Sequence, residues 1–445
     1  MHQIFLNLNQ SLTFYCVFPV IVGLGIFFTL KLRCLQLTRL TMSLRSLLSS
    51  KQEGTGSISS YQAVAAVIAG NLGTGNISGM AVALSTGGPG SLVWMWVMAF
   101  LGSIIQYSSC VLGAKYRDKN ASGEYVGGPM YYLRKGLNLK KTAIGFSIFT
   151  LIAAFAVGNF AQVNSMVLPL KTMGFNPLLC GIVIAILASL VILGGVKRIA
   201  KVAASIVPVM ALLYLLAGAV ILCLHSQAII PALWIMLKSA FQGSSFVGGV
   251  MGFTVVKALS TGFERGIFAT DAGTGIVPIL QSGARSKDVV MNGVATLVAP
   301  FLVMIICSMT GLILVVTGAC DQVGLASTNM VVFAFSQVFG EIGGLVIVLV
   351  ALFLFAYTTI IAWGGCAEKA AEFLWNRKKV KLFQYLYLAL IPVGAVARVD
   401  FVWIFADLAI SLMLITNLIG IIGLRKEVIE ETKRYFFPST VKEGE

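Results

Sequence analysis

The sequence predicts an all-α membrane protein that crosses the bilayer eleven times. Of its 445 residues, 58% are hydrophobic and 11% are charged, and the mean hydropathy is +0.92, whereas about 25% of the residues of a soluble domain are charged. The apolar runs are continuous rather than alternating, which indicates helices instead of barrel strands. The runs that are long enough to cross about 30 Å of hydrocarbon are 12–31, 61–85, 90–113, 143–168, 178–196, 203–224, 252–282, 289–317, 341–365, 381–397 and 400–423.

The first span, 12–31, is predicted to be a retained helix. No Lys or Arg precedes it, and the basic residues Lys31, Arg33 and Arg39 follow it in place of a small-residue cleavage site, so it differs from a signal peptide. The next stretch, 32–48, interleaves leucines with arginines and is expected to lie along the membrane surface.

The basic residues indicate the orientation of the chain in the membrane. Loops assigned to the inside hold 27 of the 32 Lys and Arg residues, loops assigned to the outside hold three, and two lie in the seventh span. This bias predicts an outside N-terminus and an inside C-terminus. The net charge of +15 therefore reflects topology and contact with anionic lipids, and no nucleic-acid partner is expected.

Two of the spans contain polar, glycine-rich interruptions. Residues 70–79 read Gly-Asn-Leu-Gly-Thr-Gly-Asn-Ile-Ser-Gly, and residues 268–275 read Phe-Ala-Thr-Asp-Ala-Gly-Thr-Gly. Each glycine in a helix interior costs about 1 kcal/mol relative to alanine, and backbone groups freed inside a membrane must find partners. Both spans are predicted to break and to line a protected cavity that binds a polar cargo.

The positions of the two breaks predict two repeats. Each break opens a set of five spans, and an odd number of spans reverses the orientation of the second set, which is typical of inverted-repeat transporters. The predicted segments are an N-terminal helix with a surface stretch (1–60), the first repeat (61–224), an outside connection (225–251), the second repeat (252–423) and an inside tail (424–445).

The composition disfavours an enzyme. The two histidines, His2 and His225, lie far apart, and the eight cysteines are scattered without a C-x-x-C pair, so neither a metal cluster nor a disulfide framework is expected. The spacing G-x-G-x-x-x-G in the first break, inside a membrane span, does not fit a nucleotide-binding loop.

At the level of motifs the chain resembles the sodium:alanine/glycine symporters, the alanine-or-glycine:cation symporter family. The longest matching string is Gly-Glu-Tyr-Val-Gly-Gly-Pro-Met-Tyr-Tyr at 123–132. Other strings that carry the resemblance are at 73–77, 87–90, 94–96, 115–117, 158–159, 194–199, 265–268, 272–273, 355–359 and 417–418. The chain departs from the family at the second break, where Ala269-Thr270-Asp271 replaces the usual Ser-Asn-Glu.

The resemblance implies a leucine-transporter-like fold, with one extra N-terminal helix before a five-plus-five inverted repeat. It also implies Na⁺-coupled symport of alanine or glycine, in either stereochemical form of alanine, by alternating access. Na⁺ would be the co-transported ion, with no organic cofactor, and the protein would act as a monomer in a bacterial cytoplasmic membrane.

The first break offers groups for a substrate carboxylate and for cations. Unwinding at Gly73-Thr74-Gly75-Asn76 exposes amides at the start of a half-helix, where anions bind, and the side chain of Asn76 could present its oxygen to a cation near the carboxylate. Thr358 and Thr359 carry hydroxyl oxygens, which are hard ligands suited to Na⁺. The resemblance implies that they complete a sodium site with the backbone carbonyls of Ala69 and Leu72.

The second break and its neighbours supply the remaining candidate residues. Thr270 and Asp271 could face the first break, and Asp271 could hold Na⁺, take the substrate ammonium or pair with Arg265. Arg265 and Asp407 could close an outer gate, with Glu264 as an alternative partner of Arg265. Pocket walls are expected from four further side chains, Phe268, Trp363, Asn159 and Gln162.

Two rival functions follow from the same residues. A proton-coupled carrier would use Asp271 as the proton acceptor, whereas the two neighbouring threonines favour sodium. An intramembrane enzyme would need a nucleophile with a base or a metal, which the two distant histidines do not supply. Arg117, Glu124 and Tyr125, in the inside loop, are expected to tie helix ends together.

Overall fold

A computed structural model gives the fold of the chain. It describes residues 11–48, 54–120, 122–242, 244–245, 252–322, 324–325, 327–375 and 377–437. The predicted segments 1–60, 225–251 and 424–445 each extend partly outside these residues. Within them the fold is almost entirely helical, as the composition predicts, and the strands form two short antiparallel hairpins.

The first half of the chain, to residue 224, contains the following elements: η1 (Leu12–Val17), α2 (Phe18–Lys31), α3 (Leu35–Thr38), α4 (Leu40–Leu48), α5 (Ser60–Asn71), η2 (Thr74–Asn76), α6 (Ser78–Gly87), α7 (Ser91–Lys115), β1 (Asp118–Lys119), β2 (Tyr125–Val126), α8 (Pro129–Lys135), α9 (Lys140–Phe155), η3 (Ala156–Phe160), α10 (Ala161–Thr172), α11 (Pro177–Ile192) and α12 (Gly195–Leu224).

The second half contains these: α13 (Ser226–Gln242), β3 (Ser244–Ser245), β4 (Gly252–Phe253), α14 (Val255–Thr270), α15 (Ile276–Gln281), α16 (Val289–Val294), α17 (Ala299–Val316), η4 (Ala319–Asp321), α18 (Thr328–Leu374), α19 (Arg377–Ala389), α20 (Ile391–Val396), α21 (Val399–Gly423) and α22 (Arg425–Phe436). Gly340, with φ of +74°, divides α18 into two helical parts. The helix α13 lies within the segment 225–251 that is predicted to be an outside connection.

Eight helices in the described ranges are long and apolar enough to cross a membrane. They coincide with eight of the eleven predicted spans. The other three predicted spans differ in kind: 178–196 forms the 16-residue helix α11, and 61–85 and 252–282 are each divided into shorter helices. The chain is therefore a helical membrane protein whose two glycine-rich spans are interrupted, as predicted.

Local sequence explains where the first interrupted span begins and stops. The Ser59 hydroxyl accepts from the Gln62 amide and the Gln62 side chain accepts from the Ser59 amide, a capping box that starts α5. The helix lasts 12 residues, or about 18 Å, which is too short to cross about 30 Å of hydrocarbon. It ends at Asn71, with Leu72 as its C-cap, and α6 begins only at Ser78.

The second interrupted span has the same design with different residues. The Thr254 hydroxyl caps the start of α14 by accepting from the Lys257 amide. The helix ends where Asp271 takes a left-handed conformation, with φ of +49°, and Gly273 and Gly275 follow at +87° and +92°. Left-handed backbone is costly for residues other than glycine, so the two glycines allow the chain to turn into α15.

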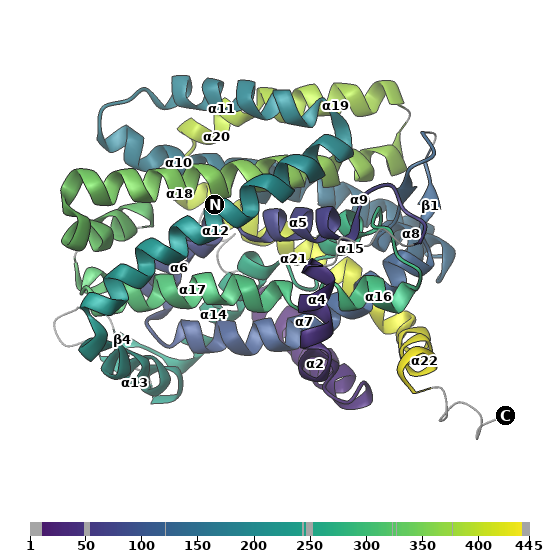
Figure 1. Cartoon of the computed structure of the whole chain (residues 1–445), viewed down its shortest axis with the longest axis horizontal. Helices are drawn as coiled ribbons and strands as arrows, with labels where there is room; N and C mark the ends of the chain where they lie inside the picture. Colours follow the sequence, from purple (N-terminus) through teal and green to yellow (C-terminus); the bar gives the residue numbers. More distant parts are fainter. Residues whose placement is uncertain are drawn as a thin grey trace.

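The interrupted helices lie inside the bundle, against long helices. In Figure 1, α5 runs through the middle of the molecule, where it packs against α12, α15 and α18. The helix α7 packs against α14, α15, α16 and α2. The N-terminal helix α2 is closely fitted, since a Cβ atom on Gly25 would lie 2.7 Å from Cβ of Leu101.

The predicted tail begins with a docked helix. In α22 the Thr432 hydroxyl contacts the Tyr107 hydroxyl at 2.7 Å, and both side chains are fully buried. Lys115 of α7 forms ion pairs with Glu427 at 2.8 Å and Glu431 at 3.1 Å. The charged sequence of this segment is thus used partly for packing against α7.

Replacing Thr432 by valine is expected to destabilise the protein by about 1–3 kcal/mol, because the buried Tyr107 hydroxyl would lose its partner. The measurement is thermal unfolding of the purified protein in detergent. Thr416→Val is the matched control, since the Thr416 hydroxyl donates only to carbonyls of its own helix. Equal unfolding temperatures for the two variants would contradict the assignment.

Candidate functional site

The backbone freed at the first break is bonded partly by its own side chains. The Asn76 amide nitrogen donates to the carbonyl of Asn71 at 2.9 Å and to that of Gly73 at 3.2 Å. The Asn76 oxygen, which the sequence analysis offers to a cation, accepts from the Cys307 thiol at 3.1 Å. Asn76 therefore stabilises the unwound conformation from within the break.

Gln162 reaches the same break from α10. Its oxygen accepts from the Thr74 amide at 2.9 Å and from the Thr74 hydroxyl at 3.1 Å, and its nitrogen donates to the Val157 carbonyl at 2.9 Å. A Cβ atom on Gly73 would lie 2.8 Å from the Gln162 oxygen and 2.9 Å from the Thr359 hydroxyl. A side chain at position 73 would therefore displace the Gln162 amide or the Thr359 hydroxyl, because polar side chains from two helices converge on this backbone.

The two neighbouring threonines of α18 face different surroundings. The Thr359 hydroxyl donates to the carbonyl of Ala69 at 2.8 Å, two residues before α5 ends at Asn71. The Thr358 hydroxyl donates to carbonyls of its own helix, those of Leu354 and Phe355. Leu72, the other predicted backbone ligand, is buried at the end of α5. Of the two hydroxyls, Thr359 is therefore the one bonded to the first break.

The second break is held by side chains from distant helices. The Asn417 amide of α21 donates to the Gly273 carbonyl at 2.7 Å, and the Asn417 oxygen accepts from the Tyr132 hydroxyl. Thr270 is fully buried, and its hydroxyl donates to its own helix at the Gly266 carbonyl. Asn417 and Tyr132 lie in strings that carry the family resemblance, but the sequence alone gave neither a role.

One hydrogen bond joins the two breaks directly. The Asn71 amide nitrogen, at the last residue of α5, donates to the carbonyl of Thr270, the last residue of α14, at 2.7 Å. The Asn71 oxygen is buried and has no hydrogen-bond partner among the described residues. The ends of the two broken helices are therefore neighbours, as the sequence analysis predicts.

Asp271 is buried beside the breaks and is not paired with Arg265. One of its carboxylate oxygens has no hydrogen-bond partner in the described part of the chain, and the side chain is 1% exposed. Cys366 of α18 lies close enough to interact with it electrostatically. Because Arg265 pairs with Asp407 instead, three of the roles considered for Asp271 remain: binding a cation, binding the substrate ammonium and accepting a proton.

Aromatic rings cover the first break on the side of α14. A Cβ atom on Gly75 would lie 2.6 Å from the ring of Phe268, and the Phe268 and Trp403 ring centroids are 4.9 Å apart. The Arg265 guanidinium lies over both rings, 5.4 Å from Phe268 and 4.9 Å from Trp403. The Arg265–Asp407 ion pair adjoins this aromatic layer. Trp403, in the last predicted span, was not among the expected residues.

The remaining two predicted wall residues differ in orientation. Trp363 is fully buried, and a Cβ atom on Gly158 would lie 2.2 Å from Cβ of Trp363. The Trp363 indole nitrogen has no hydrogen-bond partner within the described ranges. Asn159 donates to the carbonyl of Tyr387 in α19 at 2.9 Å, so its amide nitrogen is bonded to α19 and not to the breaks.

The segment before α5 and the segment after α15, away from the breaks, are hydrogen-bonded to each other. Ile58, just before α5, accepts from the Arg285 amide at 2.9 Å, after α15. Arg117 donates to the carbonyls of Ala284 and Thr55, which confirms the expected tie between helix ends. The Lys369 ammonium of α18 is buried and donates to the Ile279 carbonyl at 3.0 Å, near the end of α15.

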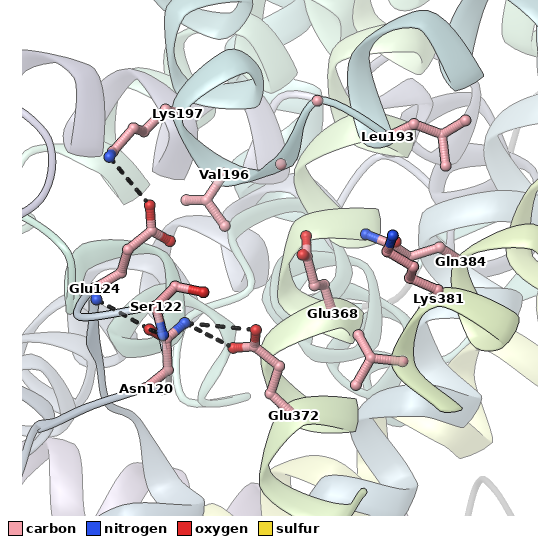
Figure 2. A pocket seen from close by; sticks show the side chains of 13 residues that line it. Asn120, Ser122, Glu124, Leu193, Val196, Lys197, Glu368, Glu372, Lys381 and Gln384 are labelled. Carbon is pink, nitrogen blue, oxygen red and sulfur yellow. Dashed lines mark hydrogen bonds and ion pairs between the residues drawn. The ribbon is translucent and has the colours of Figure 1, made fainter. Parts of the chain in front are cut away.

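A polar cavity of about 280 Å³ lies near the C-terminal end of α18. Figure 2 shows Glu368 in this cavity, with Lys197 paired to Glu124 and Asn120 donating to Glu372. These residues come from α12, α18 and the connection between β1 and β2. Nearby, at the β1 end of this connection, the ion pair with Lys135 lowers the pKa of Asp118.

Comparison with known proteins places the chain among transporters. The chain is 38% identical over 427 residues to the sodium/alanine symporter AgcS of Methanococcus maripaludis, covering 94% of this chain and 93% of that one. It is 39% identical to an uncharacterized transporter of Haemophilus influenzae, with 93% and 91% covered. It is also 34% identical to the probable sodium/glutamine symporter GlnT of Bacillus subtilis, with 96% and 89% covered.

The chain is also similar in fold to a solved structure. The substrate-bound, outward-open structure of a Na⁺-coupled sialic acid symporter superposes with a TM-score of 0.53 at 14% identity, covering 94% of this chain and 87% of that one. The model of the sodium:alanine symporter family matches residues 1–444. The predicted family is thereby confirmed, and with it the expectation of a transporter rather than an enzyme: the chain belongs to the sodium:alanine symporter family.

Proposed function

We propose that this protein imports a small neutral amino acid, alanine or glycine, together with Na⁺ by alternating access. The observation that carries the proposal is the hydrogen bond from the Thr359 hydroxyl to the Ala69 carbonyl, at the point where the first helix breaks. It brings two hard oxygen ligands together at a site lined by unwound backbone. The family and the names of the relatives support sodium coupling.

The membrane topology that we propose has eleven crossings, with the N-terminus outside and the C-terminus inside. The interrupted spans and α11 are added to the eight long apolar helices. Repeats at 61–224 and 252–423 would form an inverted pair of the leucine-transporter type, in a cytoplasmic membrane and in a monomer. The similar break at the start of each repeat and the shared fold of the sialic acid symporter support this arrangement.

In the proposed site, the amides of Gly73-Thr74-Gly75-Asn76 would bind the substrate carboxylate and the adjacent carbonyls would bind Na⁺. The Thr74 amide would first have to leave the Gln162 oxygen, and the Gly73 and Asn76 amides their carbonyl partners. Ala69, Leu72, Thr358 and Thr359 supply the cation ligands, after the Thr359 hydroxyl turns its proton away from Ala69. Asn76 would serve a second cation only by releasing the Cys307 thiol. Unwound carbonyls at broken helices are the usual ligands for co-transported cations.

The size of the proposed cargo follows from the side chains around the break. Phe268 fills the space that a side chain at position 75 would need, and Trp363 does the same at position 158. Since both rings are buried, little volume is left for a larger substrate. Gln162 and Thr270 would fix the substrate position, and Asn159 would support the wall through α19.

Asp271 and the Arg265–Asp407 pair complete the proposal. The unpartnered Asp271 oxygen would accept a positive charge, from the substrate ammonium or a cation, because an uncompensated buried carboxylate is costly. Arg265 and Asp407, beside the aromatic layer, would form the outer gate and separate when the site opens outward.

Proton coupling is the second candidate function. It is favoured by the same unpartnered Asp271 oxygen, which would carry the proton. The test is uptake of radiolabelled alanine and glycine by proteoliposomes, with a Na⁺ gradient and no pH gradient, and then with the gradients exchanged. We expect uptake only with Na⁺. Uptake driven by the pH gradient alone would favour the proton carrier.

Thr359→Ala is expected to raise the Na⁺ concentration for half-maximal uptake at least about tenfold, equivalent to about 1.4 kcal/mol, because one cation ligand is lost. Thr359→Ser keeps the hydroxyl and should behave like the wild type. Thr317→Ala removes a hydroxyl that donates to its own helix and serves as the control. An unchanged Na⁺ dependence in the alanine variant would remove Thr359 from the proposed site.

Gly75→Ala is expected to reduce uptake at least about tenfold, because its methyl group would lie 2.6 Å from the Phe268 ring and would displace that ring or the break. Gly145→Ala is the matched control, since the nearest atom to its added methyl group is 4.0 Å away, in the Phe149 side chain of the same helix. Uptake is measured at equal amounts of reconstituted protein. Normal uptake by Gly75→Ala would show that Phe268 yields freely and would contradict the proposed size limit.

A further inference from the structure

A second pocket, of about 340 Å³, lies at the joined ends of the broken helices. Its walls come from the amphipathic helix α4, the start of α5, the segment after α15 and the helix α16. This volume falls within the range of about 300–1,000 Å³ that is usual for small-molecule sites. The lining residues used in the argument are Arg45, Ser60, Gln281, Arg285, Lys287 and Asn292.

Three cationic side chains line this pocket. Arg45 belongs to α4, whereas Arg285 and Lys287 belong to the segment after α15. Arg45 and Lys287 are exposed, and Arg285 is half-buried. Basic pockets between the helices of a membrane protein are suited to anionic headgroups, so the charge of the pocket indicates an anion.

Two buried amide side chains form part of the wall and carry unused hydrogen-bonding groups. Asn292 is 2% exposed and Gln281 is 1% exposed. Within the described residues, both polar atoms of Asn292 and the oxygen of Gln281 have no hydrogen-bond partner. Buried polar groups are normally bonded, so these amides indicate a ligand with hydroxyl donors in addition to its negative charge.

We propose that this pocket binds a phosphoglycerol group. The phosphate would accept hydrogen bonds from Arg45, Arg285 and Lys287, and the glycerol hydroxyls would bond to the amides of Asn292 and Gln281. The group could come from the headgroup of phosphatidylglycerol or from free glycerol phosphate. With the proposed topology, which places the loops at 32–60 and 283–288 inside, the headgroup would belong to the inner leaflet.

A ligand in this pocket would affect transport, because the pocket lies between the broken helices. The Ser60 hydroxyl, at the start of α5, donates to the Arg285 carbonyl at 2.6 Å, so one wall already bridges the two broken helices. The helix α4 is attached nearby, because the Ser43 hydroxyl accepts from the Val298 amide at 3.1 Å. A bound anion would connect α4 to the segment after α15 and favour the arrangement in which these ends are joined.

The test measures binding to the purified full-length protein in detergent, independently of uptake, by native mass spectrometry. The probes are dioleoyl phosphatidylglycerol, dioleoyl phosphatidylcholine and glycerol 1-phosphate. The wild type is expected to retain phosphatidylglycerol over phosphatidylcholine. In the Arg45→Gln/Lys287→Gln double variant this retention should fall at least about tenfold. Competition by glycerol 1-phosphate would identify a soluble source, and its absence a lipid source.

Two further variants make the result specific. Lys140→Gln/Lys141→Gln removes two exposed cations that do not line the pocket, and should retain phosphatidylglycerol like the wild type. Asn292→Leu, of nearly equal size, should lose the preference for phosphatidylglycerol over phosphatidic acid, which lacks the hydroxyls. Unchanged retention by the Arg45/Lys287 variant, or an equal loss in the Lys140/Lys141 control, would overturn the proposal, whatever the uptake assays show.

Discussion

The constraint on which this structure depends is that backbone groups inside a membrane must be hydrogen-bonded. Each broken helix releases such groups, and an unmet group costs several kcal/mol in hydrocarbon. Side chains bond to these released groups. Asn76 and Thr359 donate to carbonyls of the first break, and Gln162 accepts from the Thr74 amide of the same break. Asn417 donates to the Gly273 carbonyl of the second break. The helices α10, α18 and α21 are arranged so that the side chains of Gln162, Thr359 and Asn417 reach the breaks, and this explains why these polar residues are buried in an apolar chain.

The same arrangement explains the use of glycine. At Gly73 and Gly75, the side chains of Gln162, Thr359 and Phe268 approach within 3 Å of where a side chain would begin. Gly273 and Gly275 take the left-handed conformation that follows Asp271, and Gly275 is also crowded, since a Cβ atom there would lie 2.5 Å from Cγ of Pro129. Crowding thus acts at both breaks and left-handed backbone only at the second, although in the sequence both appear only as glycine-rich interruptions of an apolar span.

The sequence predicted the helical class, both interruptions and eight spans that coincide with long apolar helices, because composition and glycine content act locally. It also predicted that Arg265 and Asp407 could pair. It did not predict Asn417, Tyr132 or Trp403, whose partners lie on helices more than a hundred residues away, and no periodic pattern reports such pairings. The direction of the Asn159 side chain and the docking of α22 on α7 were missed for a related reason: a polar residue in a helix, or a charged segment at its end, does not reveal which neighbour it faces until the helices are packed.

The bond from Asn71 to the Thr270 carbonyl spans 199 positions of sequence and only 2.7 Å of space. It attaches the end of α5 to the end of α14, so a displacement of one helix end would displace the other. The half-helices α5 and α14 would therefore move together rather than independently. An ion that binds and shifts the carbonyls next to Asn71 would therefore also shift the segment that carries Asp271. The ion would not need to contact the second break.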